Sequence, residues 1–267
     1  MFALRRPRQS KLIRMAVCAL PFIVVPLIWE LGSNVWGSSV LPSFVETLHL
    51  FVNSTFHDAI ISSQGGGRGG YLPHVAATFV HVLTGVSLGT LTGVFAALAL
   101  HYAPRIREYF EPLLEAVRVV PPLILVPFVL LVVGPTELAQ FIVCGLYVAL
   151  TVFIYAVNAL ENVTSEYWVI ARINRASQWQ TLSTVAMPAI LPELIGGVRI
   201  SIATALGIVV VGEYLGAPSG IGRVLKFALS FARIDLILVG VVWTAILGLV
   251  LDTLVNTLLR RTTKWKS

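Results

Sequence analysis

The histidines are the side chains of this chain best suited to acid–base or metal chemistry. They lie at positions 49, 57, 74, 81 and 101, and none sits in a His-Glu-x-x-His or Cys-x-x-Cys setting. The sequence therefore predicts no metal site. His81 and Ser87 could be imagined as a base and a nucleophile, but six residues along a helix put them on different faces. We expect no catalytic, metal-binding or cofactor-binding residues in this chain.

Energy coupling needs either a nucleotide site or charges inside the membrane. The pattern Gly-x-x-x-x-Gly-Lys-Ser/Thr does not occur, so an ATPase that drives this protein would be another chain, which would bind the ATP and magnesium. Glu30, Glu213 and Asp252 lie near the ends of apolar stretches, whereas ion-coupled carriers place ionisable groups deep in the bilayer. Proton or sodium coupling is therefore poorly supported.

The elements that would position any such groups are membrane helices. Only 12% of the 267 residues are charged and the mean hydropathy is +0.86, whereas soluble domains have roughly 25% charged residues. A span needs about 20 mostly apolar residues, and continuous apolar runs exclude the alternation of a membrane barrel. We predict an all-α integral membrane protein with six spans, at about 15–36, 75–101, 117–134, 138–160, 194–215 and 236–259.

Basic residues determine the predicted orientation. A basic arm, residues 1–14, precedes the first span, which has no clear cleavage site and is expected to be retained rather than removed as a signal peptide. Thirteen Lys and Arg residues fall on the side of this arm and four on the other, so both termini are predicted to be cytoplasmic. This topology accounts for the net charge of +6, and a nucleic-acid partner is not needed.

Residues 15–267 form one predicted transmembrane domain. Its largest outer segment, 37–74, combines apolar residues at helical spacing, typical of an interfacial amphipathic helix, with a Gly-rich stretch that we interpret as a flexible linker. The two cysteines, Cys18 and Cys144, lie inside predicted spans and are expected to be buried free thiols.

Two groups of residues within the spans are candidates for helix packing or for a transport path. Gly85, Gly89 and Gly93 recur at spacing four, which lets another helix approach closely in lipid. Pro121 and Pro122 lack amide donors and must bend or break their helix. Such breaks are tolerated along a transport path, but a kinked packing helix would also explain them.

A polar, weakly basic segment, residues 165–194, interrupts the apolar chain. Its first part, "SEYWVIARINRAS", is predicted to form an amphipathic helix that Ser165 caps. Such a helix either lies on the bilayer or docks into a groove of a partner. One strip of this helix brings together Trp168, Ala171, Arg172 and Arg175.

The segment also resembles a known family. "ARINRAS" (171–177) followed by "MPAILPELIGGVRI" (187–200) is similar to the cytoplasmic signature of binding-protein-dependent ABC importer permeases, E-A-A-x-x-x-G followed by Leu-Pro. The resemblance is closest to the nitrate/sulfonate/taurine group, extends from about residue 20 to the C-terminus, and includes "EPLLEAVRVVPPLILVPF" (111–128), "GEYLGAPSGIGRVL" (212–225) and "LGLVLDTLVNTLLRR" (247–261).

The resemblance implies that residues 165–178 form a coupling loop, a short cytoplasmic helix between spans four and five that sits in a cleft of the ATPase. Two positions depart from the signature, because its glutamate falls on Val169 and its glycine on Arg175. A heteromeric pore whose other permease carries the full motif is therefore an alternative to a homodimer. The residues expected to dock the ATPase are Trp168, Ala171, Arg172, Asn174, Arg175, Ala176 and Ser177.

The expected function is that of the transmembrane subunit of an ATP-driven importer in the cytoplasmic (inner) membrane. The resemblance implies two ATPase subunits, a second permease copy or a paralogue, an extracytoplasmic substrate-binding protein, and a small solute, such as a sulfonate or nitrate anion or a small heterocycle. A stand-alone channel or ion-coupled carrier is the alternative. An intramembrane enzyme that uses His81 is the third hypothesis.

Overall fold

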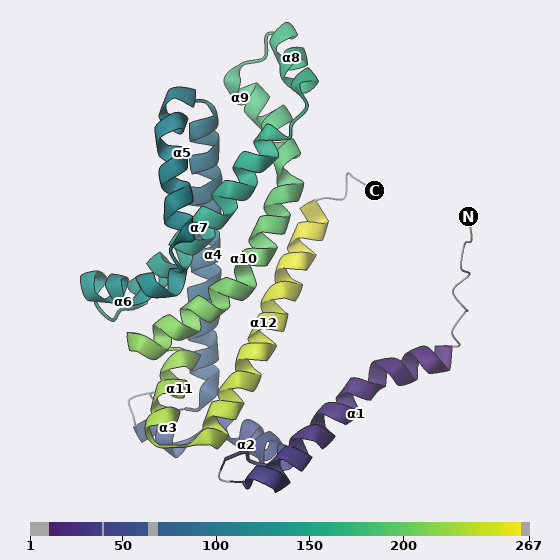
Figure 1. Ribbon diagram of the computed structural model, residues 1–267, viewed down its shortest axis with the longest axis vertical. Coiled ribbons are helices and arrows are strands. Elements are labelled where there is room, and N and C mark those ends of the chain that lie inside the picture. Colours follow the sequence, from purple (N-terminus) through teal and green to yellow (C-terminus); the bar gives the residue numbers. More distant parts are fainter. Residues whose placement is uncertain (1–10, 39, 64–68, 263–267) are drawn as a thin grey trace.

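Four long apolar helices form the bundle of this protein (Figure 1). The computed structural model describes residues 11–38, 40–63 and 69–262, and within these ranges the regular structure is entirely helical. The long helices are α4 (Tyr71–His101), α7 (Glu137–Glu161), the continuous helix Gln178–Gly216 and α12 (Ile234–Thr262). They confirm the second, fourth, fifth and sixth predicted spans.

The continuous helix begins earlier than predicted and contains an irregular turn. It consists of α9 (Gln178–Thr181), the π-helical segment η1 (Leu182–Ala186) and α10 (Met187–Gly216), 39 residues in all. The predicted span, 194–215, covers only the later part of this helix, because Pro188 and Pro192 lie within it without ending it and the π-helical segment comes directly before them. The helix thus runs without interruption from the segment after residue 177 to the far end of the bundle.

The predicted third span, 117–134, is not a single helix. The chain forms α5 (Pro104–Val119) and α6 (Pro122–Val133), which are separated at Val120 and Pro121. This is the break expected from Pro121 and Pro122. The 12 residues of α6 reach only about 18 Å, too short for a bilayer core about 30 Å thick.

The first predicted span corresponds to α1 (Lys11–Trp36), whose apolar part within the described residues is Ile23–Trp36. α1 leaves the bundle and meets it at α2 (Phe44–Phe56) (Figure 1). The Trp29 indole donates a hydrogen bond to the Pro42 carbonyl (2.9 Å), and the Glu30 carboxylate accepts one from the Phe44 N–H (2.9 Å). Glu30 therefore helps to satisfy the N-terminus of α2.

The predicted amphipathic helix of the segment 37–74 is present as α2, followed by the short α3 (Ala59–Ser63). A capping box between Ser43 and Glu46 starts α2, since each side chain accepts a hydrogen bond from the other residue's N–H (both 3.1 Å). Phe51 stacks on Trp243 of α12 with ring centroids 5.0 Å apart. Part of the Gly-rich stretch, residues 64–68, and residues 1–10 of the basic arm lie outside the described residues.

The core is centred on the crossing of α4 and α7. Gly85, Gly89 and Gly93 lie against α7, and a Cβ atom on Gly89 would be 2.6 Å from the Gly145 carbonyl oxygen. The absence of a side chain therefore permits this close approach. Cys144 of α7 is buried with a free thiol, as predicted, whereas the side chain of Cys18 lies outside the described part.

Candidate functional site

Residues 165–178, the predicted coupling loop, project from one end of the bundle, between α7 and α10 (Figure 1). Its helix, α8 (Ser165–Ile173), begins after Thr164, whose side chain makes no capping hydrogen bond. The predicted cap by Ser165 was wrong, because Ser165 is the first residue of the helix. The opposite end of the bundle carries α2, α3 and the turn between α11 (Ile221–Ser230) and α12 (Figure 1).

A left-handed residue ends α8. Arg175 has φ +52°, its N–H donates to the Arg172 carbonyl, and the Ala176 N–H donates to the Ala171 carbonyl (both 3.0 Å). This pair of hydrogen bonds is a Schellman motif, in which glycine is the usual residue at the left-handed position. The position where the resembling family has glycine is thus one that requires this conformation, and arginine adopts it here.

The start of α9 is fixed as firmly as the end of α8. The Ser177 hydroxyl accepts a hydrogen bond from the Gln180 N–H (3.2 Å), and the Gln180 side chain accepts one from the Ser177 N–H (2.8 Å). Together they form a capping box. Ser177 belongs to the predicted site, whereas Gln180 was missed, although its spacing of three from a serine is the signature of this motif.

The predicted docking residues lie on two different faces of the coupling loop. Ala171 is buried and Trp168 is partly buried against the core of the bundle, whereas Arg172, Asn174 and Arg175 are exposed. The exposed face also carries apolar side chains that are not among the predicted docking residues. These are Tyr167, Val169, Ile170 and Ile173 of α8, together with Trp179 of α9.

A second group of polar residues is buried inside the bundle, where the sequence analysis did not expect one. The Glu213 carboxylate on α10 accepts hydrogen bonds from the Thr78 hydroxyl (2.9 Å) and the Gly222 N–H (3.0 Å), and its other oxygen lies 2.8 Å from Nδ1 of His81. These contacts join α4, α10 and α11. The available signal was the spacing of His74, Thr78 and His81, which share one face of the otherwise apolar α4.

The buried group does not include the nucleophile that was imagined for His81. Ser87, the imagined nucleophile, is exposed while His81 is buried, so the two lie on different faces of α4, as expected. Among the described residues, no group of three His, Cys, Asp or Glu side chains is arranged to hold a metal ion. We interpret the Glu213 cluster as a polar clamp between three helices.

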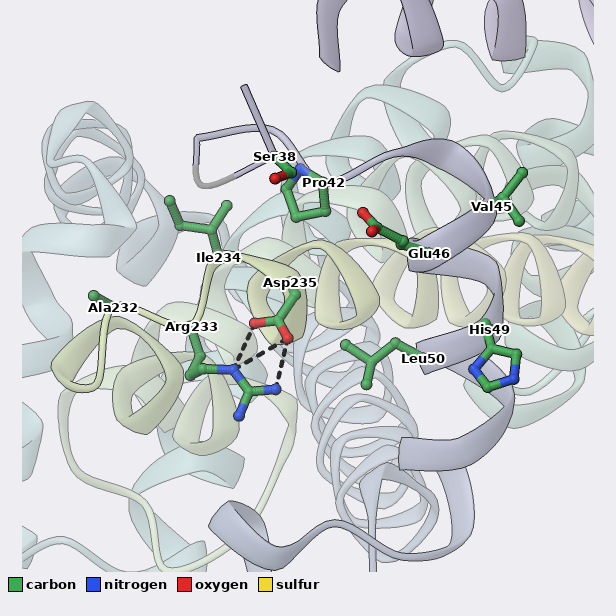
Figure 2. Close-up of a pocket in the computed structure, with 10 residues that line it drawn as sticks. All are labelled: Ser38, Pro42, Val45, Glu46, His49, Leu50, Ala232, Arg233, Ile234 and Asp235. Carbon is green, nitrogen blue, oxygen red and sulfur yellow. Dashed lines mark hydrogen bonds and ion pairs between the residues drawn. The ribbon is translucent and has the colours of Figure 1, made fainter. Parts of the chain in front are cut away.

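At the end opposite the coupling loop, a cavity of about 730 Å³ opens between α2 and the α11–α12 turn (Figure 2). Arg233 and Asp235 form a forked ion pair in its wall, with Nη2 and Oδ2 2.6 Å apart. The hydrogen bond to Asp235 raises the pKa of the Arg233 guanidinium above its ordinary value. Glu46 and His49 of α2 line the facing side (Figure 2).

Residues 89–264 match the model of a protein family described as binding-protein-dependent transport system inner membrane component. The chain belongs to this family. It is therefore a multi-pass permease of the inner membrane and a subunit of an ABC transporter. In such transporters the ATPase is a separate subunit, so neither ATP hydrolysis nor a cofactor is expected on the permease itself.

Curated relatives resemble the permease over most of its length. An aliphatic sulfonates transport permease protein of Bacillus subtilis is 27% identical, over 98% of this chain and 92% of that protein. A riboflavin transport system permease protein of Chloroflexus aurantiacus is 26% identical, over 98% and 95%. A nitrate import permease protein of Synechocystis is 25% identical, over 91% and 86%.

Two solved transporters share the fold of the permease. One chain of a bacterial ABC transporter involved in alginate import aligns with a TM-score of 0.64 at 16% identity, over 94% of this chain and 96% of that one. A chain of the MetNI methionine ABC transporter in an inward-facing conformation aligns with a TM-score of 0.58 at 20% identity, over 72% and 94%. At these sequence identities, the similarity shows a shared fold.

Proposed function

We propose that this permease forms the translocation path of an ATP-driven importer and that its coupling loop docks the cytoplasmic ATPase. The observation that supports this proposal is that α8 and α9 expose Tyr167, Ile170, Ile173 and Trp179 to solvent together with Arg172. Aromatic residues and arginine are the types most enriched at interface hot spots. A face of this composition, on a helix that projects beyond the bundle, suits a groove of a soluble protein.

Under this proposal the complete importer contains two ATPase subunits and two permeases, which are copies of this chain or this chain and a paralogue. The path lies where the two permeases meet. The end with the coupling loop is cytoplasmic, as the distribution of Lys and Arg predicts. The opposite end, with the cavity of Figure 2, then faces the extracytoplasmic substrate-binding protein.

The proposed solute is a small anion such as a sulfonate or nitrate. This choice rests on the transport functions for which relatives are named, which include an aliphatic sulfonates permease, a taurine permease of Escherichia coli that is 28% identical, and a nitrate permease. The riboflavin permease among the relatives makes a heterocycle the alternative. Measuring solute binding by the partner receptor distinguishes the two.

One observation favours a second candidate, an ion-coupled carrier that works alone. The His81–Glu213 pair is a buried ionisable pair within the membrane helices, which is where such carriers hold their protons. This candidate predicts solute uptake by the purified permease in proteoliposomes driven by a proton gradient, with no ATPase present. The importer proposal predicts no uptake under the same conditions.

The decisive experiment isolates the tagged permease from native membranes and identifies the ATPase that co-purifies with it. Replacing Arg172 or Arg175 with glutamate should reduce the recovered ATPase at least tenfold, because the docking face then carries the opposite charge. Arg105→Glu is the matched control, since Arg105 is exposed at the start of α5 outside the coupling loop. Equal recovery from all variants would overturn the docking role.

A further inference from the structure

Apart from its connections along the chain, α8 meets the membrane helices through an aromatic contact. The Trp168 ring lies against the imidazole of His101, with centroids 5.1 Å apart and planes inclined by 31°. His101 is the last residue of α4. The contact therefore joins the coupling loop to a helix more than sixty residues earlier in the sequence.

We propose that His101 is a positioning residue that ties the coupling loop to α4, so that a displacement of α8 moves the cytoplasmic end of this helix. The part of the proposal that concerns the ATPase rests on the proposed function. The part that concerns the tie between α8 and α4 does not, because it is a property of the permease alone.

The two faces of α8 support this division of roles. Trp168 and Ala171 point into the protein, whereas Ile173 on the outer face is 74% exposed. The inner face therefore packs against the bundle and holds α8 in place, whereas the outer face is exposed and can bind a partner. On the inner face, the ring–ring contact to His101 reaches α4.

The cytoplasmic end of α4 is linked to α7, so a force applied at His101 acts on both helices. Directly after α4 the chain turns into α5, where Arg107 forms an ion pair with Glu161 at the end of α7. Further along, the glycine face of α4 is packed against α7. Movement of the His101 end is thus passed to α4 and α7 as one unit.

The coupling loop reaches α10 by a different route. α9, η1 and α10 form one continuous helix, so α10 follows the loop through the backbone. α7 is joined to the loop through the backbone as well, because only residues 162–164 separate it from α8. α4 has no such connection, so the His101 contact gives the loop a direct link to a third membrane helix.

The first test measures the distance between nitroxide labels on α8 and α4 in the purified permease in nanodiscs. Ile173→Cys and Phe95→Cys carry the labels, because both side chains are exposed (74% and 75%), in a background with Cys18→Ala and Cys144→Ala. We expect a narrow distance distribution with His101, a distribution at least twice as wide with His101→Ala, and recovery with His101→Phe, which retains an aromatic ring.

Two further variants separate the contact from a general loss of structure. Trp168→Ala removes the other ring and should broaden the distribution as His101→Ala does, and the double variant should add nothing further. Tyr109→Ala removes an exposed aromatic ring from α5, outside the contact, and should leave the width unchanged. A His101→Ala distribution as narrow as that of the parent, or no recovery with phenylalanine, overturns the tie.

The second test uses the complex with the co-purified ATPase, trapped with ATP and vanadate. The α8–α4 distance should stay constant on trapping with His101, since the two helices move together, and should change with His101→Ala. A change in the parent protein larger than the width of its distribution overturns the transmission. If no ATPase co-purifies, the proposed function fails, and the measurement on the permease alone still decides the role of His101.

Discussion

The Nδ1 atom of His81 lies 2.8 Å from a carboxylate oxygen of Glu213, and both side chains are almost completely buried. The two residues are 132 positions apart and belong to different membrane helices. Since a buried carboxylate is tolerated only when its oxygens are satisfied, the hydrogen bonds from Thr78 and Gly222 are as necessary as the contact with His81.

Glu213→Ala should therefore destabilise the permease strongly. The substitution leaves the buried His81 ring nitrogen and the Gly222 N–H without their partner, whereas the Thr78 hydroxyl can still donate to the His74 carbonyl. Breaking such a buried pair costs about 3–5 kcal/mol. Glu213→Gln keeps the shape and one acceptor and should cost less. Thermal unfolding in detergent measures both, with Glu108→Ala, an exposed carboxylate on α5, as the control. An unchanged midpoint for Glu213→Ala would show that the clamp contributes no stability.

Gly89→Ala should loosen the crossing of α4 and α7. The added Cβ atom would lie 2.6 Å from the Gly145 carbonyl oxygen and 2.7 Å from the Val148 Cβ atom, so the helices must separate. Overpacking of this kind costs about 1–3 kcal/mol. Gly207→Ala on α10 is the matched control, because nothing lies within 4 Å of its added atom. The unfolding midpoint should fall for Gly89→Ala and stay the same or rise for Gly207→Ala.

Arg175→Gly should stabilise the end of α8. The residue has a positive φ, and a left-handed conformation costs a non-glycine residue about 1–2 kcal/mol. Hydrogen exchange of the Arg175 and Ala176 amides should slow, because these are the donors of the Schellman motif. Ala232→Gly is the companion variant, since Ala232 has the same φ of +52° after α11. Faster exchange in Arg175→Gly would contradict this account of the turn.

The orientation can be tested by labelling single cysteines in intact spheroplasts. His57→Cys, after α2, should react with a membrane-impermeant maleimide from outside, whereas Gln178→Cys, at the start of α9, should react only after permeabilisation. Both positions are exposed, so a difference in their labelling reports the side of the membrane on which each one lies. The opposite pattern would reverse the topology.

Hydropathy predicted the parts of the fold that depend on single segments. The helices from Tyr71, Glu137 and Ile234 begin within a few residues of the predicted spans, because continuous apolar stretches of this length have few alternatives in a membrane. The break at Pro121 was also predicted, from the missing amide donors. This segment was still predicted to be a full span. Apolar residues continue on both sides of the break, so hydropathy alone does not show that α5 and α6 are two separate helices.

The parts that sequence reasoning missed depend on residues far apart. In the sequence, Glu213 is only a residue near the end of a span. Its contacts with Thr78 and His81 become visible only in the folded structure. The sequence showed Arg175 only as a departure from the family's glycine, whereas the structure shows that the residue has a positive φ and that the two hydrogen bonds of the motif form around it. In the first case the missing information is tertiary contact. In the second it is the strength of a local hydrogen-bond pattern relative to a residue preference.

The π-helical segment Leu182–Ala186 lets the continuous helix hold one surplus residue. Each residue of an α-helix turns the chain by about 100°, so a surplus residue in a regular α-helix would rotate α8 about the axis of α10. The wider π-helical turn absorbs that residue, and α8 keeps its azimuth. Deleting one residue from this segment is therefore expected to restore an ordinary α-helical turn without moving α8, whereas deleting one from the regular part of α10 would swing the proposed docking face to another side of the bundle.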